Sequence, residues 1–216
     1  MVMLIYLKQI AILIMLSSCG VQKDIPKYIS EKFTYCYDGK DTGIDSLLKL
    51  DGYYVIAESF KDMGYNSNKD TSYFNIMFYE NGICVFNFFP LDNKGRVIDN
   101  TFMPLFFKTI IDERESKKAY YFYNARGWGR YIIEGDTIKA QCIYRPRAEE
   151  TTTIWGINEV WYKIMDRTTI IEIPSESLTT ATTSLKSIYL PARFVPVKEK
   201  PTPDCWLMKE DWFRCQ

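Results

Sequence analysis

Apolar and polar residues alternate along much of the chain after residue 52, with the period of two that is typical of strands with one buried face. The clearest example is residues 137–144, in which Ile138, Ala140, Cys142 and Tyr144 share one face of the predicted strand. We predict strands at residues 53–57, 73–79, 83–89, 120–123, 130–133, 137–144, 154–165, 169–173 and 188–197. Such a series of short strands predicts a mainly β domain.

Turn residues separate several of these strands. Asn81-Gly82 lies between two apolar runs, which is the strongest short signal of a hairpin and favours a type I′ turn. Gly135-Asp136 and Asp166-Arg167 separate two further pairs of strands. Hairpins between consecutive strands indicate an antiparallel sheet in which neighbours in sequence are neighbours in space.

The rest of the chain shows little strand pattern. Ile44, Leu47 and Leu48 have helical spacing and predict a short helix near the start of the domain. We predict an irregular stretch at 90–107 and a charged excursion at 109–118 that contains at most one short helix. Residues 188–197 carry a proline near each end, so we expect that strand at a sheet edge or a barrel mouth.

A meander of about eight strands escapes exposed edges by closing on itself. The stretch 52–197 resembles the lipocalin-like barrels of small bacterial lipoproteins, through the short helix, Gly52-Tyr53-Tyr54 at the first strand and the hairpins that follow. In that family a Trp on the first strand packs under an Arg of the last strand. The resemblance implies that Tyr54 takes the place of the Trp and Arg193 that of the Arg, in a calycin-type barrel, with a β-sandwich as the alternative fold.

The first twenty residues have the pattern of a signal peptide. Seven apolar residues at 10–16 are far fewer than the roughly 20 that a membrane-spanning helix needs. Ser17, Ser18 and Cys19 follow, and Leu16-Ser17-Ser18-Cys19 resembles the lipobox of bacterial lipoproteins. The resemblance implies cleavage before Cys19 and acylation of its thiol, with two or three chains that hold the protein firmly on a membrane.

The anchor predicts where the protein resides and how it is divided. Gly20 follows the cysteine where an Asp would favour inner-membrane retention, so we expect the outer membrane of the cell envelope. We predict a signal peptide at 1–18, a tether at 19–32, a barrel at 33–197 and a Pro-containing spacer with a Cys-bearing segment at 198–216, packed on the barrel.

Composition excludes several classes of function. Lys plus Arg and Asp plus Glu both number 27, and this balance argues against a nucleic-acid partner, which would need a basic excess. The chain contains no His, which excludes Ser-His-Asp and Cys-His catalysis and imidazole-bound metals. We therefore predict a protein that is not an enzyme and has no cofactor or metal.

Five cysteines remain once Cys19 is acylated, and an exported protein can form disulfides. Cys84 and Cys142 lie in strand-like runs, where we expect buried thiols. We expect Cys36 to pair with Cys205 or Cys215 and so to join the two ends of the domain, with Cys205–Cys215 as the local alternative. Of these pairs, we predict Cys36 with Cys205.

Two functions fit these features. The first is a binding module that holds a small apolar or glycan ligand inside the barrel. The alternative is that the inward-facing rings fill the barrel and leave no cavity. The candidate ligand contacts are Phe78, Phe86, Phe88, Trp128 and Tyr144, with Trp128 either exposed at the barrel mouth or packed under a glycine turn. The second function is an accessory protein that contacts another envelope protein through the ring-rich strand around Trp155, Trp161 and Tyr162.

Overall fold

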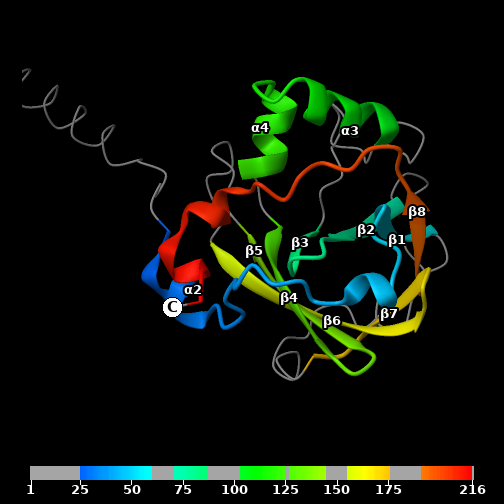
Figure 1. The fold of residues 1–216 in the computed structure, drawn as a ribbon, viewed down its shortest axis with the longest axis horizontal. Coiled ribbons are helices and arrows are strands. Elements are labelled where there is room, and N and C mark those ends of the chain that lie inside the picture. The colour runs from blue at the N-terminus through cyan, green and yellow to red at the C-terminus, as the bar shows by residue number, and fades with distance from the viewer. Residues whose placement is uncertain are drawn as a thin grey trace, which may run out of the picture.

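Eight antiparallel strands close into a barrel in which each strand pairs with its neighbours in sequence and β8 returns to β1 (Figure 1). The computed structural model describes residues 25–59, 71–86, 103–124, 127–144, 155–175 and 191–215, and only the backbone of 56–59, 71–74 and 144. The strands are β1 (Gly52–Ser59), β2 (Thr71–Phe78), β3 (Ile83–Phe86), β4 (Trp128–Glu134), β5 (Thr137–Tyr144), β6 (Gly156–Asp166), β7 (Thr169–Ile173) and β8 (Pro191–Pro196). The predicted lipocalin-like, mainly β fold is confirmed. Signal peptide and lipobox, including Cys19, lie outside the described residues.

Alternation along the strands divides the apolar residues between two cores. The residues that face the barrel interior include Tyr54, Ile76, Phe78, Cys84, Phe86, Tyr131, Ile138, Ala140, Cys142, Val160, Tyr162, Ile170 and Ala192. Their neighbours in sequence, such as Tyr53, Met77 and Val85, belong to a second core outside the barrel wall. The predicted common face of Ile138, Ala140 and Cys142 is therefore confirmed.

The seam between β1 and β8 closes the barrel. Gly52 pairs with Pro196, and a Cβ at Gly52 would lie only 2.1 Å from the carbonyl oxygen of Val195. Strand β8 also pairs with β7, so the prediction that it lies at a sheet edge is wrong. Its two prolines stand at its ends, where a missing N–H interrupts the ladder least.

The residues carried over from the lipocalin pattern are only partly in place. Tyr54 faces the interior as the family's Trp would, and it packs on Phe194 of β8 with ring centroids 5.4 Å apart. Arg193 occupies the opposite face of β8 and is exposed, and its Nη1 donates to Thr169 Oγ1 at 3.4 Å. The expectation that Arg193 packs over Tyr54 is therefore wrong, because adjacent residues of a strand point to opposite faces.

The predicted hairpins are present, with one change in turn geometry. The N–H of Gly82 donates to Tyr79 O at 3.1 Å, and the N–H of Tyr79 donates to Ile83 O at 2.9 Å. The central residues of the turn are thus Glu80 and Asn81, and Gly82 follows them with φ of 84°. The loop therefore has three residues and ends on a left-handed glycine, and it is not the two-residue type I′ turn that we predicted.

Two helices stand where the sequence indicated an irregular stretch and a strand. Helices α3 (Met103–Asp112) and α4 (Lys117–Asn124) cover the outer core of the barrel (Figure 1). The strand predicted at 120–123 is wrong, because Ala119, Phe122 and Tyr123 are buried at the i, i+3, i+4 spacing of a helix. Four consecutive aromatic residues resemble a strand by propensity, but only the helix buries one side of them while leaving Tyr120 exposed.

The two ends of the domain meet at the outer core. Helix α2 (Lys27–Lys32) lies within the predicted tether and buries Ile29, while η3 (Trp206–Lys209) and η4 (Asp211–Phe213) bury Leu207 and Phe213. A disulfide joins Cys36 to Cys215, beside a parallel bridge between Tyr37 and Arg214.

The candidate pairing of Cys36 with Cys205 is wrong. Cys205 is a free, buried thiol, and Cys36 bonds to the other partner that we considered, Cys215. Sequence spacing could not choose between them, since both cysteines stand in the same terminal segment. Cys84 and Cys142 are buried free thiols, as predicted.

The barrel end that carries the short hairpins is closed by apolar side chains. Ile44 of η1 (Ile44–Ser46) and Leu48 are fully buried against the interior cluster, and the predicted short helix is this single turn. The hydroxyl of Tyr54 donates to the carbonyl oxygen of Arg167 at 2.8 Å and ties the turn between β6 and β7 to the same end. Among the described residues, no helix has the length and apolar character needed to cross a membrane.

Candidate functional site

The rings predicted to line an internal ligand cavity pack on one another. Phe78 and Phe86 face inward and are 1% and 3% exposed. The ring of Phe78 packs edge-to-face on Tyr131, with centroids 5.2 Å apart, and on Tyr162 at 6.3 Å. A cavity large enough for a ligand would leave its lining side chains with accessible surface. The interior around Phe78 is therefore filled.

Two other candidate contacts cannot be placed in this core. Phe88 and the side chain of Tyr144 lie outside the described residues. The contact of Phe78, Phe86, Phe88 and Tyr144 with a ligand stays a prediction, and the packing of the first two rings does not favour it.

Trp128 belongs to the outer core. It is completely buried, and its indole Nε1 donates to the carbonyl oxygen of Phe122 at 2.6 Å. The ring meets Phe122 edge-to-face at 5.3 Å and stacks on Tyr79 at 6.0 Å. The expectation of an exposed ring at the barrel mouth is wrong, and the alternative, packing near the glycine turn, is the observed one. Trp128 directly follows Gly127, and its contacts with Phe122 place it under α4.

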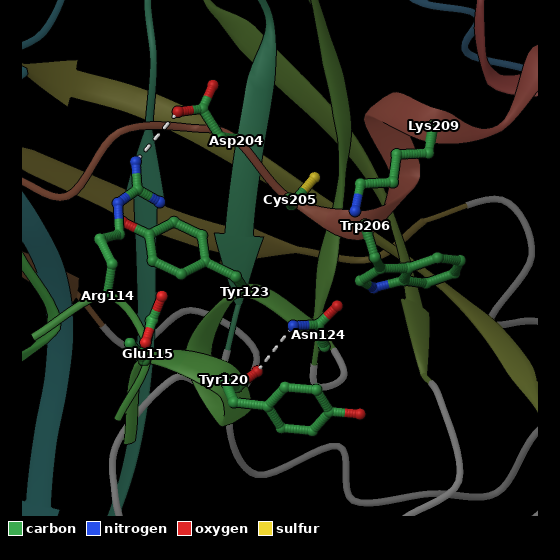
Figure 2. Close-up of a pocket in the computed structure, with 10 residues that line it drawn as sticks. Arg114, Glu115, Tyr120, Tyr123, Asn124, Asp204, Cys205, Trp206 and Lys209 are labelled. Carbon is green, nitrogen blue, oxygen red and sulfur yellow. Dashed lines mark hydrogen bonds and ion pairs between the residues drawn. The ribbon is translucent and has the colours of Figure 1, made fainter. Parts of the chain in front are cut away.

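A groove outside the barrel is a concave site built from described residues of two segments. It lies between α4 and the C-terminal segment, is half-open and has a volume of about 250 Å³ (Figure 2). Its lining residues are Arg114, Glu115, Ala119, Tyr120, Tyr123, Asn124, Asp204, Cys205, Trp206 and Lys209. We call it the α4 groove.

One wall of the α4 groove comes from the helix. The hydroxyl of Ser116 accepts from the N–H of Ala119 at 3.1 Å and caps the start of α4. This start puts Ala119 and Tyr123 on the buried side and Tyr120, which is 59% exposed, at the rim. The side-chain amide of Asn124 donates to the carbonyl oxygen of Tyr120 at 3.1 Å. The aromatic rim is therefore held by regular helical structure.

The opposite wall comes from the C-terminal segment. Trp206 packs edge-to-face on Trp155 at 5.7 Å, and the hydroxyl of Tyr28 on α2 donates to Trp155 O at 2.6 Å. Cys205 beside it is buried, and burial raises the pKa of its thiol to about 12. That thiol is protonated at neutral pH, so Cys205 supplies apolar surface rather than a nucleophile.

An ion pair joins the two walls. The Nη2 of Arg114 donates to Asp204 Oδ2 at 3.1 Å and to Thr202 Oγ1 at 2.8 Å. Its guanidinium lies over the Tyr123 ring, 4.3 Å from the centroid. Burial raises the pKa of Tyr123, and the positive charge of Arg114 partly offsets this effect.

The remaining groups make the α4 groove polar and balanced in charge. Lys209 and Glu115 are exposed at its edge, beside the pair of Arg114 and Asp204. Rings and hydrogen-bonding groups therefore stand close together in an open site. Within the described ranges, no group of three or more His, Cys, Asp or Glu residues is placed to hold a metal ion.

Sequence reasoning missed the α4 groove. Its helix was read as a strand, and the helical spacing of Ala119, Phe122 and Tyr123 was the signal that identifies it. The rings of the strand proposed to contact a partner lie on both faces of that strand, as predicted, and the contact itself stays a prediction. Tyr162 faces the interior and Trp155 is buried, while Trp161 is half-buried with the Lys139 ammonium 4.3 Å from its ring centroid.

The fold and site define a class: a closed, antiparallel, lipocalin-like barrel with a filled core and an external groove. No protein-family model matches the sequence, no curated protein matches it, and no solved structure matches the chain.

Proposed function

We propose that this protein is a lipid-anchored lipoprotein of the cell envelope, with the outer membrane as its expected location. Its domain acts as a non-catalytic binding module. Leu16-Ser17-Ser18-Cys19 at the end of a short apolar run supports the anchor, since a thiol next to small residues is what the acylation and cleavage steps require. The absence of His from the sequence supports binding rather than acid–base or nucleophilic catalysis.

The α4 groove carries the proposal for the ligand. An exposed ring, Tyr120, stands beside Asn124, Lys209 and the pair of Arg114 and Asp204. A sugar presents apolar C–H faces that stack on rings and hydroxyls that bond to amides and charged groups, so this combination fits a glycan better than a purely apolar molecule. A volume of about 250 Å³ suits one or two sugar units that extend through the open side.

The ligand test uses the mature chain with Cys19→Ser and two sugar probes, N-acetylglucosamine trimer and maltotriose. Trp206 lines the groove, so its fluorescence reports occupancy. We expect saturable binding of at least one probe, weakened about tenfold or more by Tyr120→Ser through loss of ring stacking. Met165→Ser changes an equally exposed residue far from the groove and leaves binding unchanged.

Two results would reject this ligand assignment. The first is that neither probe binds saturably. The second is that Tyr120→Ser and Met165→Ser weaken binding to the same degree. The anchor is tested separately by labelled palmitate in a bacterial host, which enters the wild-type chain and not Cys19→Ser. Label in both chains, or in neither, would reject acylation at this cysteine.

A second candidate function is an accessory protein of an envelope complex. The filled interior around Phe78 favours it over a carrier that encloses its ligand in the barrel. The two are separated with an apolar fluorescent probe such as N-phenylnaphthylamine. Saturable binding that apolar competitors displace supports a carrier, and no saturable binding of this probe or of the sugars favours the accessory role.

A further inference from the structure

Exposed apolar side chains gather on the helices of this protein. Among the described residues, the large apolar side chains that are most exposed are Tyr28, Leu105, Tyr120, Tyr121 and Met165. Four of these five lie on helices, and only Met165 lies on a strand, at the end of β6. Leu105 is 62% exposed on a helix whose other side is buried. Exposed apolar side chains that share one face are typical of a contact surface.

Helices α3 and α4 present this surface together. Met103, Phe107 and Ile110 of α3 and Phe122 of α4 are buried in the same outer core. Their exposed sides therefore face away from the barrel on the same side of the molecule (Figure 1). We define the helical face as Leu105, Tyr120 and Tyr121 together with the exposed lysines Lys108, Lys117 and Lys118.

Lysines flank the apolar residues of the helical face. The Lys117 ammonium lies 5.6 Å from the centroid of the Tyr121 ring, and Lys108 stands one turn after Leu105 and pairs with Asp112 at 3.6 Å. Tyrosine rings and lysine stems with charged tips suit the boundary between lipid headgroups and acyl chains. Acidic residues in the turn between the helices balance the lysines, so apolar contact rather than net charge would supply the attraction.

The length of the tether limits where the domain can be. On the proposed function, from which this step follows, lipid is attached at Cys19, and the described structure begins at Ile25. Six residues span at most about 21 Å when extended. A domain of this size has a radius of gyration of about 16 Å, so one of its faces must lie at the membrane.

Contacts connect the end of the tether to one wall of the α4 groove, across which the helical face begins. Tyr28 on α2 bonds to the carbonyl oxygen of Trp155, whose ring packs on Trp206. Trp206 and Tyr120 line the same groove. The chain therefore enters the domain beside the C-terminal segment that forms the other wall of the α4 groove (Figure 1). The hairpin of β6 and β7 that carries Met165 is at the short-turn end of the barrel.

We propose that the helical face rests on the lipid surface to which Cys19 is anchored. Leu105 and the rings of Tyr120 and Tyr121 enter the headgroup layer, and the lysines keep their ammonium groups at its polar edge. The α4 groove, with Tyr120 at its rim, then opens beside the membrane. Its ligand would be held close to the bilayer surface.

The test attaches the domain to lipid without relying on natural acylation. The mature chain from Cys19 is coupled through that thiol to a maleimide lipid in phosphatidylcholine vesicles. The free thiols of Cys84, Cys142 and Cys205 are buried and do not compete. A membrane-impermeant amine reagent then modifies exposed lysines, and mass spectrometry compares each rate with that of the uncoupled Cys19→Ser chain.

We expect the three lysines of the helical face to react at least about threefold more slowly on vesicles. Lys40, which is exposed outside the helices, reacts at the same rate in both states. The variant Leu105→Ser/Tyr121→Ser restores the rates on vesicles, and Met165→Ser does not. Leu105 and Tyr121 do not line the α4 groove, so we expect the double variant to bind the sugar probes as the wild type does.

The proposal is overturned if the lysines of the helical face keep their rates on vesicles, or if Lys40 is protected to the same degree. It is also overturned if Leu105→Ser/Tyr121→Ser leaves the protection unchanged. Failure of palmitate labelling would reject the natural anchor and not this result, because the coupling is chemical. If neither sugar probe binds the wild-type chain, the groove ligand is rejected, and the orientation on the membrane is not.

Discussion

Cys84 and Cys142 lie on β3 and β5, and their Sγ atoms are 3.7 Å apart inside the barrel. Gly129 of β4 is paired with both cysteines and stands between them. Since Gly129 has no side chain, the two thiols meet over its backbone. The core at this level therefore depends on one glycine and on two small sulfur side chains.

Replacing Gly129 with Ala should strongly destabilise the barrel. A Cβ there would lie 1.8 Å from the carbonyl oxygen of Gln141, which is backbone and can move only if β4 separates from β5. We expect Gly129→Ala to lower the free energy of unfolding by at least about 2 kcal/mol in urea denaturation. Gly156→Ala is the matched control, because a Cβ at that strand glycine meets nothing within 4 Å. Equal effects of the two substitutions would contradict this account of β4.

The buried thiols should be unreactive in the folded protein. Burial raises the pKa of Cys84 well above its usual range, the contact with Cys142 adds to this effect, and the thiolate is the reactive form. In the Cys19→Ser chain we expect an aromatic disulfide reagent to modify Cys84, Cys142 and Cys205 only after unfolding in guanidinium. Rapid modification of any of the three under native conditions would show that its core opens locally.

Loss of the Cys36–Cys215 disulfide should loosen the C-terminal segment. The bond joins residues 179 apart, and closing such a long loop stabilises a domain by about 2–5 kcal/mol. Both cysteines are exposed, so serine itself costs little at either position. We expect Cys36→Ser, Cys215→Ser and the double variant to lose the same stability, with faster hydrogen exchange in residues 206–213. Additive losses in the double variant would assign the effect to the side chains and not to the bond.

Stability should fall with rising pH because of Glu172. Glu172 on β7 is paired with Tyr162 on β6, and Tyr162 faces the interior. Burial raises the pKa of Glu172 to about 7 from an ordinary 4.5. The folded state thus prefers the protonated acid. Below pH 4.5 both states are protonated and there is no penalty, while above pH 7 the penalty is complete.

The variant Glu172→Gln measures this effect. This rise in the Glu172 pKa corresponds to an effect on stability on the order of 3 kcal/mol. We expect the variant to be more stable than the wild type by up to that amount at pH 8 and equally stable at pH 4, in urea denaturation at both pH values. A difference between the two proteins that does not vary with pH would refute the buried acid.

Much of the fold could be predicted because its signals are local. Alternation at 137–144 requires only that neighbours in sequence point to opposite faces, and Gly82 requires only a turn with positive φ. The same reasoning failed at 120–123, where aromatic residues suit a strand by propensity. There the outer core decided, because Phe122 and Tyr123 reach Trp128 together only from one side of a helix.

The candidate site was less predictable than the fold. Phe78 and Phe86 were correctly expected inside the barrel, but whether such rings enclose a space depends on the volumes of side chains from all the facing strands. Trp128 was expected either at the barrel mouth or packed under a glycine turn, and the choice between them depends on α4, which the sequence did not reveal. The α4 groove joins Tyr120 to Trp206, which are 86 residues apart in the sequence, and no local pattern contains both.

The sequence by itself determined the order of strands and hairpins, the absence of His and the predicted acylation of Cys19. These follow from the residue types and from spacing over a few positions. Only the tertiary structure decided that Cys36 bonds to Cys215, that the core around Phe78 is filled and that a groove opens beside α4. Each of these depends on distances between segments far apart in the chain, which are set when the whole barrel packs and closes.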